Sequence, residues 1–346
     1  MNAPLPTISH EVEETILDAV DKFLERDVRQ HVLALEHADE YPHDIVEGMK
    51  ELGLFGAIIP EEYGGLGLPA STYAKIVERV SAVWMSLSGI FNSHLIMAAA
   101  VVRFGTEEQK RKWLPKFASG EIRGGLALTE PNCGTDLQAI RTVAKRDGDE
   151  YVINGTKTWI SNGIYGSAFA LLVKTDPAAE PRHKGTSLFI ADKREGFTVS
   201  RKLEKLGYKG IDSAELVFED YRVPADQLIS GEEGRGLPHA LGGLELGRIN
   251  IAARGVGVAR SALELAVKYS QERETFGEPI HNHQAIQIKL ADMATRLEAS
   301  KHLMNAAAAA YDKGERCDME AGMAKLYATE TALYNATESM LSLIHI

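Results

Sequence analysis

The sequence predicts an α+β fold in which a helical segment, a segment of short strands and a second helical segment follow one another. Apolar residues recur at helical spacing up to about residue 123, give way to short β-rich runs, and return to helical spacing from about residue 236. Strands do not alternate with helices, which argues against a Rossmann sheet. At roughly 150 residues per domain, 346 residues suffice for two to three domains. We therefore expect an N-terminal helical domain over 1–123, a β domain over 124–235 and a C-terminal helical bundle over 236–346.

Apolar stripes at helical spacing define the first segment. One stripe consists of Val12, Ile16, Ala19 and Phe23. A second stripe consists of Ile45, Val46, Met49 and Leu52, and Gly53 ends it. Thr106 and Gln109 have the spacing of a capping box, which predicts another helix after Gly105. Together these signals predict a helical bundle.

A hairpin signal opens the central segment. Asn154 and Gly155 separate two β-rich runs, residues 151–153 and 156–160, and this dipeptide tolerates the positive φ values of a type I′ turn. Further strands are predicted at 168–173, 187–191 and 214–218. Short strands separated by Gly, Pro and charged clusters are typical of a small antiparallel barrel or sandwich.

Helical spacing returns in the last segment. One face is formed by Ile286, Leu290, Met293 and Leu297, and it continues through Met304, Ala308 and Tyr311. Gly277 and Pro279 separate a first long helix from this second one, and residues 313–315 separate the second from a third that begins near Asp318.

Composition excludes several classes of protein. The net charge of −11 has the wrong sign for a nucleic-acid or anionic-membrane binder. Cys133 and Cys317 are too few for a disulfide framework, and residues 1–14 lack the basic and apolar regions of a secretory signal. The longest apolar run, 95–102, is far shorter than the roughly 18 residues of a membrane span. We expect a cytoplasmic protein with no membrane span.

Metal, hydrolase and nucleotide motifs are absent from the sequence. It contains no H-E-x-x-H, no Cys/His cluster with zinc spacing, no G-x-S-x-G and no P-loop. Gly255 and Gly257 lie in a helical stretch, so they do not form a dinucleotide fingerprint. Three histidines spaced six apart do not share one helix face and are expected at the surface: His31, His37 and His43. We expect no bound metal.

Five stretches carry a resemblance to a known family. The sequence A-L-T-E-P-N-C-G-T-D at 127–136 closely resembles the flavin and substrate motif of acyl-CoA dehydrogenases, with Cys133 where that family usually has a smaller residue. Four more agree in order and location: P-E-E-Y-G-G at 60–65, W-I-S-N-G at 159–163, E-R-E-T-F-G at 272–277, and H-Q at 283–284. The resemblance spans essentially the whole chain.

The resemblance implies a reaction, a cofactor and partners. A flavoprotein of this family oxidises an acyl-CoA thioester to trans-2-enoyl-CoA: a carboxylate takes a proton from Cα, and a hydride leaves Cβ for the FAD held between the β domain and the C-terminal helices. Hydrogen bonds to the thioester carbonyl stabilise the developing charge. Electron-transferring flavoprotein is the usual electron acceptor, and a homotetramer, built as a dimer of dimers, is the expected assembly.

Site residues follow from the matched motifs. The resemblance places the flavin against residues of the β domain, namely Leu126, Leu128, Thr129, Gly134, Thr135, Trp159 and Ser161. The pyrophosphate and adenosine part of FAD would be bound, from a neighbouring subunit, by Arg273, Thr275, Phe276 and Gln284. Arginine suits phosphate because its planar fork donates two hydrogen bonds. The acyl-CoA would contact Thr135, Glu245 and Arg248. From the residues alone, Trp159 is a core aromatic, Arg273 a helix-end charge, and Glu245 with Arg248 a solvated ion pair.

The catalytic base is missing from both positions that the family uses. Most members carry the glutamate in a Tyr-Glu-Gly-Thr segment beyond the third C-terminal helix, which the resemblance places beyond residue 346. A minority carry it immediately before the arginine that corresponds to Arg248, where this chain has Gly247. Glu245 lies two residues earlier, about 200° around the helix. We therefore expect a truncated C-terminus, with the last bundle helices missing.

Two other functions remain open on the sequence. An acyl-CoA oxidase or a flavin monooxygenase shares the fold, and oxygen uptake would distinguish them from a dehydrogenase. A non-catalytic helical subunit that lost the base is the other alternative, and a colourless purified protein would favour it.

Overall fold

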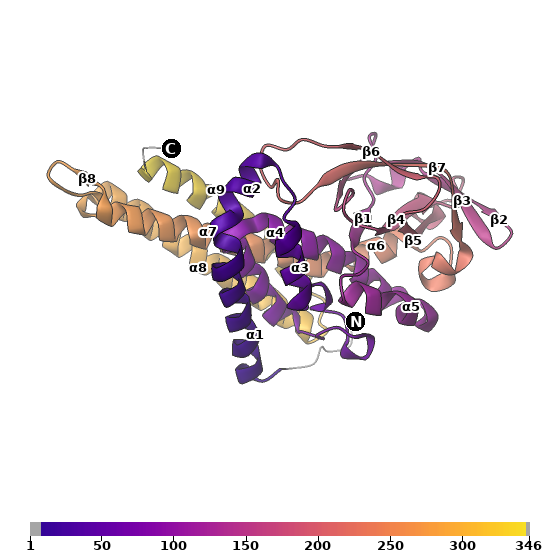
Figure 1. Cartoon of the computed structure of the whole chain (residues 1–346), viewed down its shortest axis with the longest axis horizontal. Helices are drawn as coiled ribbons and strands as arrows, with labels where there is room; N and C mark the ends of the chain where they lie inside the picture. The colour runs from indigo at the N-terminus through magenta and orange to yellow at the C-terminus, as the bar shows by residue number, and fades with distance from the viewer. Residues whose placement is uncertain (1–7, 344–346) are drawn as a thin grey trace. The chain divides into compact units, whose positions relative to one another are not determined.

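The chain forms two compact units in a computed structural model that describes residues 8–343. One unit comprises Met1–Val32, Leu68–Ser88 and Glu245–Ile346, and the other comprises Leu33–Gly67 and Gly89–Leu244. The first is helical and the second contains the sheet (Figure 1). The observed order of helices, then strands, then helices confirms the predicted α+β class.

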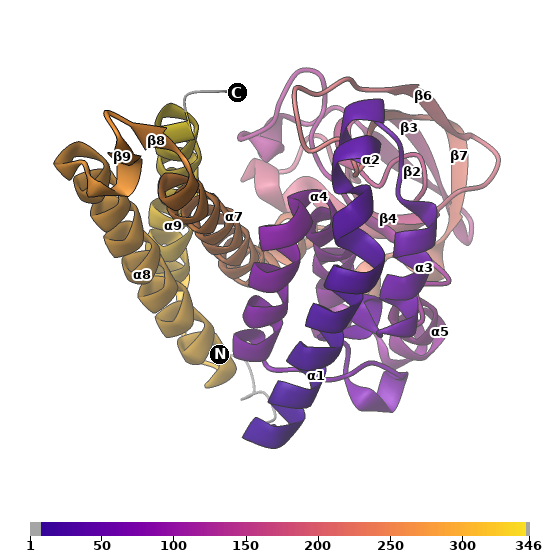
Figure 2. The ribbon, with the colours of Figure 1, turned by 60° about the vertical axis from the view of Figure 1, so that its left-hand side comes forward.

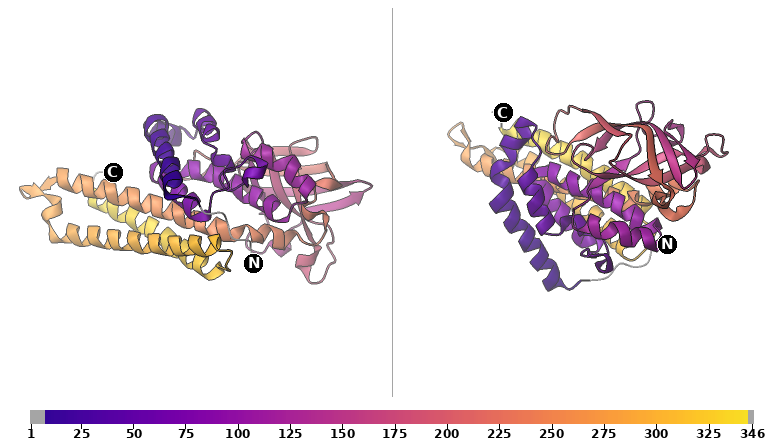
Figure 3. Two further views of the ribbon diagram at one scale, coloured as in Figure 1. Left: turned by 90° about the horizontal axis from the view of Figure 1, so that it is seen from below. Right: turned by 45° about the vertical axis from the view of Figure 1, so that its right-hand side comes forward.

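Long helices build the helical unit. Its elements are α1 (His10–Phe23), the first part of α4 (Ala70–Phe104), α7 (Leu244–Glu272), α8 (Gln284–Asp312) and α9 (Asp318–Leu343). The last three helices run side by side (Figures 2 and 3). Glycines of α7 permit close approach, because a Cβ on Gly255 would lie 2.6 Å from the Ala328 oxygen and one on Gly257 would lie 2.3 Å from the Glu78 oxygen.

A short hairpin joins α7 to α8. Its strands are β8 (Glu274–Thr275) and β9 (Glu278–Pro279), and the two turn residues, Phe276 and Gly277, have φ values of +55° and +82°. Two consecutive positive φ values are the requirement of a type I′ turn. The hairpin lies at the end of the helices (Figure 2).

A seven-stranded sheet is the centre of the second unit. Its strands are β1 (Gly124–Ala127), β2 (Val143–Asp147), β3 (Glu150–Ser161), β4 (Ala168–Lys174), β5 (Thr186–Asp192), β6 (Phe197–Lys202) and β7 (Ser213–Pro224). Their order is β1-β4-β2-β3-β7-β6, with β5 paired to β4. The unit also contains the helices α2 (Val32–Ala38), α3 (His43–Glu51), α5 (Glu107–Ala118) and α6 (Gly236–Gly242). The sheet's buried face carries a core of aliphatic residues together with the aromatic residues Tyr151, Phe169, Phe189, Phe197, Phe218 and Tyr221.

The predicted β domain is confirmed, but its strand pairing is not purely antiparallel. The strands form one mixed sheet, in which β1 and β2 pair with β4 in parallel and the remaining pairs are antiparallel. Parallel pairing requires a long connection. Residues 128–167 supply it between β1 and β4.

The predicted hairpin turn at Asn154 and Gly155 is wrong. Both residues lie inside β3, and the turn that joins β2 to β3 is formed by Gly148 and Asp149, with Gly148 at φ +61°. Gly155 adopts φ +151° at a bulge in the pairing with β7. Its Cβ would lie 2.4 Å from the Thr142 Oγ1, so glycine is required there for close approach rather than for a turn.

Most helix predictions are confirmed, and one is shifted. The capping box of Thr106 and Gln109 opens α5 with both hydrogen bonds present, and α9 begins at Asp318. In α1, however, the buried residues are Leu17, Val20 and Phe23, whereas Val12 is exposed. The buried face is therefore turned from the predicted stripe, because leucine at position 17 faces the core in place of alanine at position 19.

The expectation that no stretch approaches a membrane span was too strong. Helix α4 is long and apolar enough to cross a bilayer on length and composition alone, but 78% of that stretch is buried inside the protein. Burial of this extent is typical of a core helix.

Candidate active site

Four of the predicted flavin residues share one face of the sheet. Leu126 and Leu128 flank Ala127 at the end of β1, and Trp159 and Ser161 flank Ile160 in β3. Their neighbours Ala127 and Ile160 point the other way, into the core. The two segments are close, since a Cβ on Gly125 would lie 3.2 Å from the Ser161 oxygen.

Trp159 is presented by a β-bulge. Between Lys157 and Ile160 the register of β3 against β7 shifts, and Trp159 adopts φ +59°. A non-glycine residue in the left-handed region costs of order 1–3 kcal/mol, and such strain is concentrated at functional sites. The bulge leaves the indole 58% exposed. A large, exposed aromatic surface beside half-buried leucines suits a flat aromatic ligand, so these residues fit an isoalloxazine ring.

The loop after β1 carries the other predicted flavin residues. Glu130 and Cys133 exchange backbone hydrogen bonds of 2.9 and 3.1 Å, which close a tight turn. Beyond that turn, Gly134 and Thr135 are exposed, while Thr129 is half-buried. The Thr129 oxygen accepts a hydrogen bond from the Thr158 amide at 2.9 Å. The loop is therefore attached to the bulge that presents the indole.

A buried ion pair lies beneath this loop. The Lys157 ammonium is 2.8 Å from the Glu130 carboxylate, and the two side chains are 0% and 2% exposed. Burial opposes ionisation of the Glu130 carboxyl, but the charge and hydrogen bond of Lys157 outweigh that effect and hold its pKa below the usual range. Glu130 is thus an anion under the loop.

In the helical unit, the residues predicted to bind the pyrophosphate and adenosine gather at the β8–β9 hairpin. The Thr275 hydroxyl is 2.8 Å from the His283 Nε2, and Phe276 at the tip is 99% exposed. Arg273 and Gln284 are exposed, and neither side chain has a hydrogen bond or ion pair within residues 8–343. An exposed arginine beside a hydroxyl and an amide can bind phosphate oxygens.

The predicted substrate residues lie near the start of α7. Arg248 forms an ion pair of 3.9 Å with Asp318, not with Glu245. Glu245 is half-buried, and its carboxyl group lies beside that of Asp318. Arg316, 2.6 Å from Asp318, is the main cause that holds the pKa of Asp318 below its usual value. Gly247 is buried and offers no side chain for catalysis.

The predicted helical residues thus form two separate groups. Arg248 and Arg273 are 25 positions apart along α7, which at 1.5 Å per residue is ~37 Å. The hairpin group and the Arg248 group therefore do not meet within one chain.

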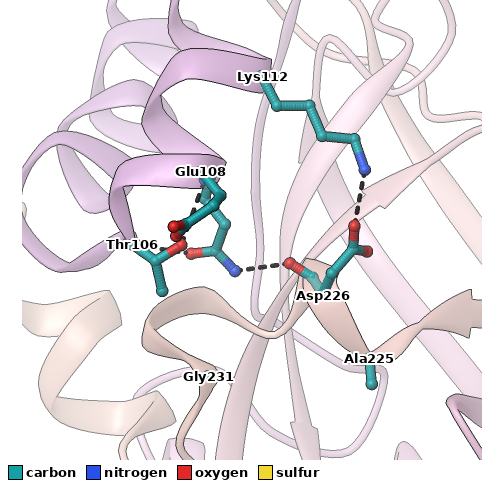
Figure 4. Close-up of a pocket in the computed structure, with 7 residues that line it drawn as sticks. Thr106, Glu108, Lys112, Ala225, Asp226 and Gly231 are labelled. Carbon is teal, nitrogen blue, oxygen red and sulfur yellow. Dashed lines mark hydrogen bonds and ion pairs between the residues drawn. The ribbon is translucent and has the colours of Figure 1, made fainter.

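The sheet unit has a pocket that is not part of the candidate site, because none of the predicted site residues lines it (Figure 4). It has a volume of about 220 Å³ and lies between the start of α5 and residues 225–231. Its polar groups bind one another: Lys112 is paired with Asp226 at 2.9 Å, and the Gln109 amide donates to the Asp226 carbonyl at 2.7 Å. Within the described chain, no group of three or more His, Cys, Asp or Glu residues is arranged to hold a metal.

Sequence reasoning missed Lys157 and Gly155. The signal for Lys157 was its place on the inward-facing side of a β-rich run, where an ionised residue requires a partner. Gly155 was assigned to a turn, because a glycine that permits close approach and a glycine that forms a turn cannot be told apart from one sequence.

Comparisons with known proteins agree along the whole chain. Three family models match: the acyl-CoA dehydrogenase N-terminal domain over residues 10–121, the middle domain over 125–221 and the C-terminal domain over 234–343. An acyl-CoA dehydrogenase from Bacillus subtilis (strain 168) is 38% identical over 335 residues, which cover 96% of this chain and 88% of the relative.

Solved structures agree as well. Butyryl-CoA dehydrogenase from Megasphaera elsdenii is 32% identical with a TM-score of 0.93, covering 98% of this chain and 89% of that one. A chain in a structure of the electron transferring flavoprotein of Acidaminococcus fermentans is 36% identical with a TM-score of 0.93, covering 97% and 88%. The alignments cover 88% to 89% of these relatives' own lengths, so the comparisons do not support the expected truncation. Residues 1–7 and 344–346 lie outside the described residues. With all three domains matched, the chain belongs to the acyl-CoA dehydrogenase family.

Proposed function

We propose that this chain oxidises an acyl-CoA thioester to trans-2-enoyl-CoA and passes the electrons to electron-transferring flavoprotein. The family is FAD-dependent. The observation that carries the proposal is the single sheet face shared by Leu126, Leu128, Trp159 and Ser161. The chain's relatives include short-chain specific acyl-CoA dehydrogenases, which supports an acyl-CoA substrate.

Each group of residues has a proposed task. Leu126, Leu128 and Trp159 hold the flat ring and exclude water from one side of it, and the hydroxyls of Thr129 and Ser161, with the backbone at Gly134, hydrogen-bond to its polar edge. Bound FAD supplies the acceptor for the hydride that leaves Cβ. Thr135, Glu245 and Arg248 bind the acyl-CoA, with the Arg248 guanidinium as the positive charge available to its acidic groups.

The hairpin residues act on a second copy. Arg273, Thr275, Phe276 and Gln284 lie ~37 Å from the Arg248 end of α7, so we propose that they bind the pyrophosphate and adenosine of FAD in a neighbouring subunit. This requires an oligomer, and a homotetramer built as a dimer of dimers meets the requirement. We also propose a cytoplasmic location, a role in fatty acid metabolism, and domain boundaries at 1–123, 124–235 and 236–346.

Neither Gly247 nor Glu245 is placed to act as the general base. Gly247 has no side chain, and the carboxyl group of Glu245 lies beside that of Asp318.

Anaerobic titration tests the proposed function. The purified protein is mixed with short, branched and long acyl-CoAs, and the flavin absorbance is followed. Bleaching by one of them supports dehydrogenation. Rapid oxygen uptake on re-aeration would instead indicate an oxidase or monooxygenase, and a protein that binds no flavin would indicate a non-catalytic subunit.

A further inference from the structure

We infer that Glu130 and Lys157 are positioning residues for the flavin site, because together they fix the loop after β1 against the bulge of β3. Neither side chain is expected to touch the flavin or the substrate. The inference rests on the proposed function, since it assumes that the loop and the bulge together form the flavin face.

Three hydrogen bonds tie β3 to consecutive residues of the loop. The Lys157 ammonium donates to the Leu128 carbonyl at 3.1 Å and to the Glu130 carboxylate at 2.8 Å. The Thr158 amide donates to the Thr129 carbonyl at 2.9 Å. Every residue from 128 to 130 is therefore held by β3, and two of the three bonds come from one side chain.

Glu130 extends the attachment to the far end of the loop. Its two carboxylate oxygens accept hydrogen bonds from the backbone amides of Arg141 and Thr142, at 2.5 and 3.0 Å. A buried carboxylate with a cationic partner and two amide donors has the partners that a buried charge requires. The same side chain thus joins residue 130 to residues 141–142 and closes the loop that carries Gly134 and Thr135.

Gly155 makes room for this arrangement. Its missing side chain allows β3 to approach Thr142, where a Cβ would lie 2.4 Å from the hydroxyl oxygen and 2.7 Å from the Cα. β3 therefore contacts the end of the loop at Thr142 through Gly155, and it contacts the start of the loop at Thr129 through Thr158.

Lys157 lies next to the bulge that presents Trp159. Lys157 ends the regular pairing of β3 with β7, and the register shift that follows turns Trp159 out to the surface. The lysine that holds Leu128 is thus two residues from the indole. Loss of the tie would change the spacing between the two walls of the flavin face, whereas the sheet itself keeps its backbone hydrogen bonds.

Two single variants and one double variant separate positioning from stability. Lys157→Met leaves the Glu130 charge buried and unpaired. Glu130→Gln leaves the Lys157 charge buried and unpaired. The double variant Lys157→Met/Glu130→Gln has no unpaired charge but lacks the tie to Leu128. Gln227→Leu is the matched control, because Gln227 is a buried polar side chain of the same unit whose partners, Ile190, Asp192 and Arg194, lie in β5 or directly after it.

Four quantities are measured on the full chain: the thermal midpoint, the FAD dissociation constant, the visible circular dichroism of bound flavin, and hydrogen exchange of the Thr158, Arg141 and Thr142 amides. We expect the double variant to recover most of the midpoint lost by Lys157→Met. Its FAD dissociation constant should remain at least tenfold above the parent value, with altered dichroism and at least tenfold faster exchange. The control should lower the midpoint without changing FAD affinity or exchange at those amides.

The outcomes distinguish the inference from the proposed function. A double variant that binds FAD within twofold of the parent, with unchanged dichroism, overturns the inference alone. A parent protein that binds no FAD contradicts the proposed function and removes the flavin role of the pair with it, whatever the amide exchange shows.

Discussion

His94 gives the structure a pH dependence whose size can be calculated. The ring is fully buried on α4, its Nε2 lies 3.0 Å from the Phe117 carbonyl, and it packs edge-on against Phe55 and Phe117. Burial lowers its pKa from 6.5 to about 4. Because the unfolded chain binds the proton more tightly, stability is full above pH 6.5 and falls as the pH drops from 6.5 to 4.

At pH 5 the unfolded histidine is protonated and the folded one is not. A difference of 1.5 pH units at 1.36 kcal/mol per unit gives a loss of about 2 kcal/mol relative to neutral pH. At about 2 cal/mol/K per residue, the unfolding entropy of the chain makes this a fall of roughly 3 °C in the thermal midpoint.

The assay compares the parent with His94→Gln. Glutamine can still donate to the Phe117 carbonyl but does not titrate, so the difference between the two pH profiles isolates His94 from the carboxylates. The parent should lose about 2 kcal/mol more than the variant between pH 7 and pH 5. Parallel profiles would refute the claim that the buried ring is neutral.

Three further changes test other parts of the structure. Lys157→Met should lower the free energy of unfolding at neutral pH by about 3 kcal/mol, because it leaves a buried carboxylate without its cation; the loss should shrink in acid as Glu130 takes up a proton, and denaturant midpoints at pH 7 and pH 4 check both. Gly155→Ala should cost about 2 kcal/mol, because the new methyl group meets Thr142, and its midpoint in urea measures this. Phe276→Ala should leave the midpoint of the FAD-free protein unchanged, since the ring is exposed, yet speed FAD release in a fluorescence assay; equal release rates would remove Phe276 from the site.

Local signals predicted the helices well. The capping box at Thr106 and the break at residues 313–315 depend on hydrogen bonds and backbone angles within one turn, so the sequence contains all that decides them. The buried face of α1 was predicted less well, because Leu17 and Ile16 are both apolar and only tertiary contacts decide which of them faces the core.

The sheet was harder to predict because its order is not local. Asn154 and Gly155 are a strong turn signal, yet Asn154 pairs with β2 and Gly155 pairs with β7, and this sheet pairing overrides it. The parallel pairing of β1 with β4 joins segments more than 40 residues apart, and no short-range pattern reveals it.

The residues of the candidate site were predicted from motifs, but the buried ion pair beneath them was not. Trp159 and Thr129 were identified by resemblance, whereas the ion pair of Lys157 with Glu130 that holds them was not expected. The place of Lys157 on the inward-facing side of a β-rich run signals a buried charge, and the fold identifies Glu130 as its partner.

The most direct test of the central claim is the tryptophan fluorescence of the protein as FAD binds. The flavin ring is assigned to the face that carries Trp159, while Trp84 and Trp113 are buried elsewhere. We expect one FAD per chain and strong quenching, most of which disappears in Trp159→Phe. A protein that binds FAD with the same quenching in that variant, or that binds no FAD, would contradict it.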